Sequence, residues 1–146
     1  MMTRIFTIWY AGRNAEEFFA ILKQAGVSKV IDVRLYNTSQ LAGFTKKQDI
    51  EYFLQVIVGA AYVHLPILAP TKKLLNDYKK GLIGWQQYEE QFKRIITQRQ
   101  IERHLIPQDM DMSCLLCSEA EADNCHRRLV AEYLAEHWQD ISIHHL

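Results

Sequence analysis

The chain has few of the residues that mark unusual classes of protein. Among its 146 residues are only 3 cysteines, 3 prolines and 6 glycines, and Lys plus Arg equals Asp plus Glu at 17 each. So few prolines and glycines argue against a disordered or repetitive chain. The zero net charge lacks the basic excess that strong non-specific nucleic-acid binding requires. With 49% hydrophobic residues, we expect residues 1–146 to form a single α/β domain.

Signals for export and membrane insertion are also missing. The cysteines are odd in number, and the start of the chain at Met1 to Arg4 has no apolar signal core. No apolar run approaches the roughly 20 residues that span a bilayer. We therefore expect a cytoplasmic protein without a membrane partner, and nucleic acid is a disfavoured partner. The sequence identifies neither a cofactor nor an oligomeric state.

Short apolar runs alternate with amphipathic segments along the chain. Alternation of this kind predicts an α/β fold with a mostly parallel central sheet of about five strands flanked by helices. A helical pattern from Pro70 to about His104 adds a helical excursion before the fourth strand. The last strand alternates in polarity and is expected at an edge. The predicted strands are 5–9, 30–33, 61–65, 113–117 and 141–144.

Two helix starts carry capping sequences. Asn14 is followed three residues later by Glu17, and Thr45 is followed in the same way by Gln48. Gly26 suits the exit of the first helix because glycine adopts the left-handed conformation that ends many helices. Helices are therefore expected to begin after Asn14 and after Thr45.

Polar residues follow the carboxyl ends of the predicted strands. In an open parallel sheet, ligands bind beyond these ends because loops and helix N-termini converge there. The residues concerned should therefore lie along one edge of the sheet. They are Gly12 and Arg13, Asp32 and Arg34, His64, and Cys117, Ser118 and Glu119.

The start of the last helix has the features of an anion site. If Asp123 or Asn124 caps this helix, Cys125, His126 and Arg127 occupy its first turn, where backbone N–H groups lack intrahelical partners. Such a terminus attracts anions, and an arginine adds a bidentate grip on phosphate or carboxylate. The alternative is that an acidic residue caps the helix and the arginines only pair with nearby carboxylates.

Asp32 interrupts an apolar strand and therefore needs a partner. A buried carboxylate costs several kcal/mol unless it is paired, and Arg127, Arg13 and His126 are the candidate donors. Arg34 lies two residues further on and faces the same side of the strand, so that the two side chains can act together. The alternative is a purely structural buried ion pair.

Cys117 and Cys125 allow three interpretations. A helix N-terminus with a neighbouring histidine and arginine could lower the pKa of Cys125 and make it a nucleophile. A metal site with His126 and His64 has suitable residue types, but adjacent helical residues point about 100° apart, so Cys125 and His126 should not share one ion. No metal is therefore expected. The third interpretation is that the cysteines are small packing residues.

Four segments resemble motifs of the bacterial and archaeal domain-of-unknown-function 488 family. They are Ile8 to Arg13, Asp32-Val33-Arg34, Leu116-Cys117-Ser118-Glu119 and Cys125-His126-Arg127. This likeness extends over nearly the whole chain, although many members have Gly-His-Ser or Gly-Tyr-Gly where this chain has Trp9-Tyr10-Ala11. The resemblance implies no settled activity. The functional candidates that it implies are Arg13, Asp32, Arg34, Cys117, Glu119, Cys125, His126 and Arg127.

The residues leave two functions open. One is an enzyme, a hydrolase or transferase, that acts on a phosphate-bearing or other anionic small molecule such as a nucleotide or nucleic-acid fragment. Its catalytic candidates are Asp32, Glu119, Cys125 and Cys117, and its ligand-binding candidates are Arg13, Arg34, His126 and Arg127. The alternative is a non-catalytic module that senses a nucleotide or binds a partner through the same edge.

Overall fold

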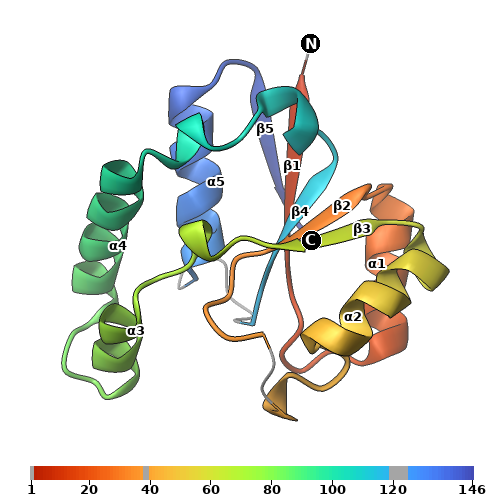
Figure 1. Ribbon diagram of the computed structural model, residues 1–146, viewed down its shortest axis with the longest axis horizontal. Coiled ribbons are helices and arrows are strands. Elements are labelled where there is room, and N and C mark those ends of the chain that lie inside the picture. The colour runs from red at the N-terminus through yellow and green to blue at the C-terminus, as the bar shows by residue number, and fades with distance from the viewer. Residues whose placement is uncertain (1, 38–39, 119–124) are drawn as a thin grey trace.

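A five-stranded parallel sheet forms the centre of the computed structural model, which describes residues 2–37, 40–118 and 125–146 (Figure 1). The strand order is β3-β2-β4-β1-β5, and every neighbouring pair runs parallel. The α/β fold predicted from the alternating pattern is confirmed, and β5 lies at an edge as expected. The strands are β1 (Thr3–Trp9), β2 (Lys29–Asp32), β3 (Ala61–His64), β4 (Ser113–Cys117) and β5 (Ile141–His145).

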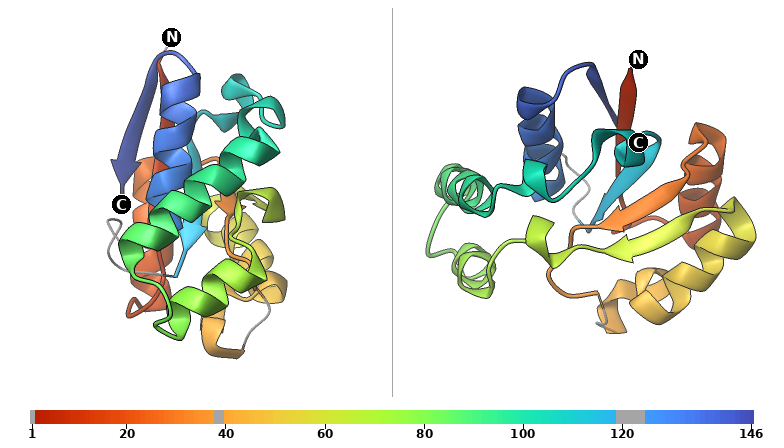
Figure 2. Two further views of the ribbon diagram at one scale, coloured as in Figure 1. Left: turned by 90° about the vertical axis from the view of Figure 1, so that its left-hand side faces the viewer. Right: turned by 45° about the horizontal axis from the view of Figure 1, so that its top comes forward.

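Helices cover both faces of this sheet. Figures 1 and 2 show α1 and α2 on one face, and α5 on the other with α4 and α3 beyond it. The helices α3 and α4 form the predicted excursion between β3 and β4. The α-helices of the described residues are α1 (Ala15–Ala25), α2 (Lys47–Phe53), α3 (Lys72–Lys79), α4 (Trp85–Arg99) and α5 (His126–His137).

Several short helical turns complete the chain. One of them, Leu54–Val58, is a π-helical turn that continues α2 directly. Among the helices of the described residues, none combines the length and the apolar character that crossing a membrane requires. The remaining turns are 3-10 helices at Gln40–Thr45, Pro66–Leu68, Ile101–Arg103 and Pro107–Met110.

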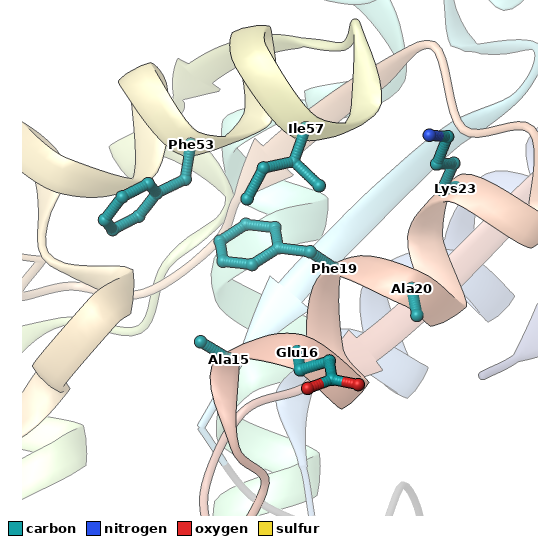
Figure 3. A pocket seen from close by; sticks show the side chains of 7 residues that line it. All are labelled: Ala15, Glu16, Phe19, Ala20, Lys23, Phe53 and Ile57. Carbon is teal, nitrogen blue, oxygen red and sulfur yellow. The ribbon is translucent and has the colours of Figure 1, made fainter.

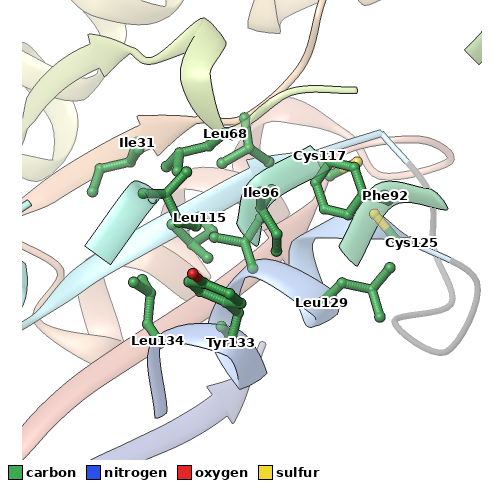
Figure 4. Close-up of a cluster of buried hydrophobic side chains, with 14 of the residues drawn as sticks. Ile31, Leu68, Phe92, Ile96, Leu115, Cys117, Cys125, Leu129, Tyr133 and Leu134 are labelled. Carbon is green, nitrogen blue, oxygen red and sulfur yellow. The ribbon is translucent and has the colours of Figure 1, made fainter. Parts of the chain in front are cut away.

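The sheet divides the buried hydrophobic side chains into two clusters. Successive side chains of a strand point to opposite faces, so Ile5 of β1 packs on the α5 side while Phe6 and Ile8 pack on the α1 side. Each face thus has its own core. Figure 4 shows the cluster under α5, whose members include Ile31, Leu68, Phe92, Ile96, Leu115, Leu129, Tyr133 and Leu134.

The capping predictions have different outcomes at the two helices. The side chain of Asn14 accepts a hydrogen bond from the backbone N–H of Glu17 at 2.8 Å, and the helix ends at Gly26 with φ 76°. The prediction for Thr45 was wrong, because α2 is preceded by Lys46 without any side-chain cap. The Thr45 hydroxyl instead accepts a hydrogen bond from Arg34 at 2.9 Å. A buried guanidinium needs an acceptor more than an exposed helix end does.

The carboxyl ends of four strands meet at one edge of the sheet. Trp9 of β1 lies beside Cys117 of β4, and Asp32 of β2 lies beside His64 of β3. The helix α5 begins at this same edge, at His126. Strand ends and helix start are thus brought together here, as parallel strands with intervening helices require.

Candidate functional site

Two polar clusters lie at the carboxyl edge of the sheet, on opposite faces. Val33 belongs to the hydrophobic cluster under α5, whereas Val30 belongs to the cluster on the α1 side. Because side chains alternate along the strand, Asp32 shares the α1 side with Val30. We call Asp32, Arg34, Thr45 and Tyr62 the carboxylate cluster. We call Cys117, Cys125 and His126, which lie on the α5 side, the thiol cluster.

The carboxylate cluster is built around a bidentate ion pair. Asp32 is fully buried, and its Oδ1 accepts hydrogen bonds from the Nε of Arg34 at 2.8 Å and from the Arg34 backbone N–H at 3.0 Å. Its Oδ2 accepts from the Arg34 Nη2 at 2.7 Å and from the Tyr62 hydroxyl at 2.6 Å. Within the described part of the chain, the donors to the Asp32 carboxylate are therefore Arg34 and Tyr62. The expected donors Arg127, Arg13 and His126 lie elsewhere, because the carboxylate faces away from α5.

The rest of the Arg34 guanidinium is held by Thr45. Nη1 donates to the Thr45 hydroxyl at 2.9 Å, and Nη2 donates to the Thr45 carbonyl at 2.6 Å. Burial lowers the pKa of Arg34, but the hydrogen bonds and charge of Asp32 outweigh burial and raise it overall. Burial and the hydrogen bond to Asp32 also raise the pKa of Tyr62. This geometry matches the structural ion pair that the sequence left as an alternative.

The thiol cluster joins the end of β4 to the start of α5. The Cys117 sulfur lies 3.7 Å from Nδ1 of His126, and the His126 Nε2 lies 2.6 Å from the backbone oxygen of Val33. A carbonyl oxygen can only accept, so Nε2 carries a proton and Nδ1 faces the sulfur. The three side chains are 1–8% exposed. Figure 4 shows Cys117 and Cys125 at one end of the hydrophobic cluster.

The structure corrects the predicted start of the last helix. Cys125 was expected in the first turn, after a cap at Asp123 or Asn124, but α5 begins at His126 with Cys125 itself in the capping position. Cys125 is extended, with φ −138° and ψ 138°. The expected divergence of Cys125 and His126 does not occur, because only one of them is helical. Asp123, Asn124 and the candidate Glu119 lie outside the described residues.

The surroundings of Cys125 and His126 shift the pKa values of both groups upward. Burial raises the pKa of Cys125 well above its ordinary value, and a hydrogen bond to Cys117 raises it further. This is opposite to the lowered pKa expected of a nucleophile at this position. Burial lowers the pKa of His126, but the sulfur of Cys117 and the carbonyl of Val33 raise it overall. Because its sulfur faces Nδ1 of His126, Cys117 is better placed than Cys125 to give up its proton to a base.

Two arginines approach Trp9 near the thiol cluster. The guanidinium carbon of Arg13 lies 3.3 Å from the centre of a Trp9 ring, and that of Arg127 lies 5.6 Å away. Arg127 is 1% exposed, and its Nε donates to the Thr7 hydroxyl at 3.3 Å. The Nε and Nη1 of Arg13 are buried without a hydrogen-bond partner among the described residues, while its Nη2 donates to the backbone of Leu146. Burial lowers the pKa of Arg13.

Other candidates are held away from the two clusters or serve as supports. Arg128 pairs with Glu132 at 3.0 Å and with Glu89 at 3.5 Å, both on helices. His64 donates from Nε2 to the backbone oxygen of Arg34 at 2.7 Å. The two backbone oxygens just after β2 therefore each accept from a histidine: that of Val33 from His126, and that of Arg34 from His64. The sequence did not identify Thr7, Thr45 or Tyr62 as site residues, and Thr45 was expected only as a helix cap. A polar residue between apolar strand neighbours was a usable signal for Thr7.

A cavity of about 350 Å³ lies away from the carboxyl edge, between α1 and the turn that follows α2 (Figure 3). Its walls are largely apolar, and none of its lining residues belongs to either polar cluster. We therefore do not place chemistry there. The lining residues are Ala15, Glu16, Phe19, Ala20, Lys23, Phe53 and Ile57.

One comparison with known families gives a match. A family model described as "Domain of unknown function DUF488" matches residues 14–134. Both polar clusters lie inside the matched range, whereas the segment from Ile8 to Arg13 lies ahead of it. Neither a curated protein nor a solved structure is similar enough to the chain to count as a match.

Proposed function

We propose a function for this chain from the premise that it belongs to the DUF488 family, whose description assigns no activity. The chain binds a phosphate-bearing or other anionic small molecule, a nucleotide or nucleic-acid fragment, at the carboxyl edge of the sheet on the α5 side. It acts on this ligand as a transferase or hydrolase, with Cys117 as the nucleophile and His126 as its base.

The observation that carries this proposal is the contact between Cys117 and His126. A nucleophilic thiol needs a base within hydrogen-bonding reach and a third group that orients the base. Nδ1 of His126 lies 3.7 Å from the Cys117 sulfur, and the backbone oxygen of Val33 holds the opposite nitrogen at 2.6 Å. The imidazole is thus fixed in the tautomer that can accept the thiol proton.

The surroundings of this pair favour negative charge. The helix α5 begins at this edge, and the positive end of its dipole attracts anions. Arg127 adds a buried positive charge in the same turn, and one of its partners is the neutral hydroxyl of Thr7. A positive potential of this origin stabilises a thiolate as well as a bound phosphate.

Asp32 and Arg34 have a supporting role in this proposal. The sequence made Asp32 a catalytic candidate and Arg34 a ligand-binding one, but each binds the other across 2.7 Å on the far face of the sheet. Their ion pair lies at the end of β2, and the backbone oxygen of the residue that follows the strand, Val33, accepts a hydrogen bond from His126. Glu119 stays a prediction because it lies outside the described residues.

Alkylation with iodoacetamide at pH 7, followed by mass spectrometry of each cysteine, tests the nucleophile. In chelator-treated protein, Cys117 should react faster than Cys114, and inorganic phosphate should slow the reaction. His126→Gln should reduce the rate at Cys117 by about tenfold, because general-base assistance is lost. The matched control His64→Gln, which alters another histidine bound to a backbone oxygen, should leave the rate unchanged.

Two results would count against this function. Equal alkylation rates at Cys117 in the wild type and in His126→Gln would remove the proposed base. Nucleotide binding that persists in Cys117→Ser, together with a lack of turnover in the wild type, would favour the non-catalytic sensing module instead.

A further inference from the structure

The thiol cluster brings three metal-binding atoms together in a buried place. The sulfurs of Cys117 and Cys125 and a ring nitrogen of His126 all lie within 4.8 Å of one another. We propose that Cys117, Cys125 and His126 form a binding site for a thiophilic divalent metal ion, of which zinc is the best fit. A bound ion would occupy the sulfur of Cys117 and block its reaction as a nucleophile. This regulatory consequence rests on the proposed function, whereas the metal site itself does not.

The donor set selects the ion. Thiolates and imidazoles are the ligands that Zn²⁺ prefers, whereas Mg²⁺ and Ca²⁺ prefer oxygen. Two cysteines and one histidine are a known catalytic zinc set that leaves a fourth position for water or another ligand. The described residues around the cluster offer this soft set in a mainly hydrophobic environment, which includes the ring of Phe92 at 5.3 Å from the His126 ring.

The distances are close to those of a tetrahedral zinc site. With bonds of about 2.3 Å to sulfur and about 2.05 Å to nitrogen, a sulfur and a nitrogen on one ion lie about 3.6 Å apart, and two sulfurs about 3.8 Å apart. The Cys117 sulfur and the His126 Nδ1 are 3.7 Å apart. Since the largest separation in the set is below 4.8 Å, movements of about 1 Å or less would complete the geometry.

The histidine already has the support that metal ligands usually have. A ligating imidazole commonly donates its other N–H to a carbonyl or carboxylate, which fixes the ring and leaves the first nitrogen free to bind. His126 donates from Nε2 to the Val33 oxygen at 2.6 Å and turns Nδ1 toward Cys117. This is the orientation that an ion between the sulfur and the nitrogen would require.

The charge balance also suits a divalent ion. Two thiolates and one divalent cation sum to zero, and a neutral assembly costs less to bury than separate ions do. A cysteine binds a metal ion as the thiolate, so each thiol must lose its proton when the ion enters. Binding should therefore replace protons by the ion, with release of about two protons per ion.

Titration of the full, reduced and chelator-treated chain with Zn²⁺ and with Co²⁺ tests the site. We expect about one ion per chain, about two protons released per ion, and a thiolate-to-cobalt charge-transfer absorption. Cys117→Ser, Cys125→Ser and His126→Gln should each weaken Zn²⁺ binding by at least about tenfold. Cys114→Ser and His64→Gln are matched controls that should bind as the wild type does, because neither residue belongs to the cluster. Unchanged binding in Cys125→Ser or His126→Gln would overturn the proposal.

A second measurement on the wild type avoids the risk that a variant fails to fold. Zn²⁺ should protect Cys117 and Cys125 from iodoacetamide and leave the labelling of Cys114 unchanged, and it should raise the melting temperature. If Zn²⁺ left the labelling rate of Cys117 and of Cys125 unchanged, the proposal would be overturned. Mg²⁺ should have no effect. Because the nucleophile is tested in chelator-treated protein, a failure to bind Zn²⁺ does not affect that test. In the same way, an unreactive Cys117 would not affect the measurement of Zn²⁺ binding.

Discussion

On the α1 side of the carboxyl edge, both carboxylate oxygens of Asp32 and every guanidinium nitrogen of Arg34 are engaged in hydrogen bonds of 3.0 Å or less. On the α5 side, the thiol cluster holds polarisable sulfur atoms at longer range, with 3.7 Å between Cys117 and His126. The first cluster has little capacity left for a ligand. The second can exchange its protons for an ion or lose one to a base. Both clusters are buried, so burial alone does not separate them. We assign reactivity to the thiol cluster because its sulfur atoms lie beside a ring nitrogen that can accept a proton, whereas the charges of the carboxylate cluster already neutralise each other.

The largest effect on stability should follow from Asp32→Asn. This replacement leaves Arg34 as a buried charge without its carboxylate, and such a loss costs about 3–5 kcal/mol in the free energy of unfolding. Urea denaturation measures it. The double replacement Asp32→Leu with Arg34→Met should cost less than the single one, because no unpaired charge remains. A loss below about 1 kcal/mol for Asp32→Asn would show that the pair is not structural.

A smaller effect is expected from Tyr62→Phe. The variant loses the hydroxyl that donates to the Asp32 Oδ2 at 2.6 Å and accepts from Asn37 at 3.0 Å. A hydrogen bond to a charged group contributes about 1.5–3 kcal/mol. The same urea experiment should give a loss in this range. An unchanged free energy of unfolding would mean that water replaces the hydroxyl, and that the carboxylate cluster still has room for another hydrogen-bond donor.

The contribution of Tyr62 should also depend on pH. Burial and the hydrogen bond to Asp32 raise the pKa of the folded phenol above its ordinary value of 10.0. A raised pKa stabilises the fold fully below the unfolded value, and this stabilisation is lost as the pH rises toward the folded value. The stability difference between the wild type and Tyr62→Phe should therefore be constant up to about pH 9 and shrink above pH 10. A difference that grows with pH would contradict the assigned hydrogen bond.

The smallest effect should come from the thiol cluster in chelator-treated protein. Cys125→Ala removes a buried sulfur that is 1% exposed, which costs about 1 kcal/mol, the typical loss for a small change in a core. Thermal unfolding of the two proteins without metal measures the difference. If Cys125→Ala lost as much stability as Asp32→Asn, both clusters would be structural, and the contrast between the two faces would fail.

Backbone patterns predicted the fold well because they depend on local periodicity. The run from Ser113 to Cys117 became β4 without change, and the alternation along β5 correctly placed that strand at an edge. The rule that residues two apart share a face of a strand placed Asp32 and Arg34 together, and their ion pair was the alternative that the sequence left open. Each of these inferences needed only residues within a few positions of one another.

The parts that the sequence did not predict depend on distant contacts. Tyr62 reaches Asp32 from 30 residues away, and Thr45 serves Arg34 rather than its own helix. The strand end was expected to meet the start of α5, and the backbone oxygen of Val33, just after β2, does contact His126. The Asp32 carboxylate, in contrast, faces the other side of the sheet. A shift of one residue at the start of α5 also turned Cys125 toward the cluster, and helix ends are the least predictable part of such a pattern.

The contact between the Val33 carbonyl and His126 is made by the main chain, so any residue other than Val at position 33 would present the same oxygen. Evolution could exchange the side chain freely among apolar residues of similar size, and a scan of side-chain replacements would overlook the position. An ester bond in place of the amide that follows Val33 would weaken the oxygen as an acceptor for His126. It would also remove the Arg34 N–H that donates to Asp32, so the loss at Asp32 would have to be subtracted before the remainder is assigned to the imidazole.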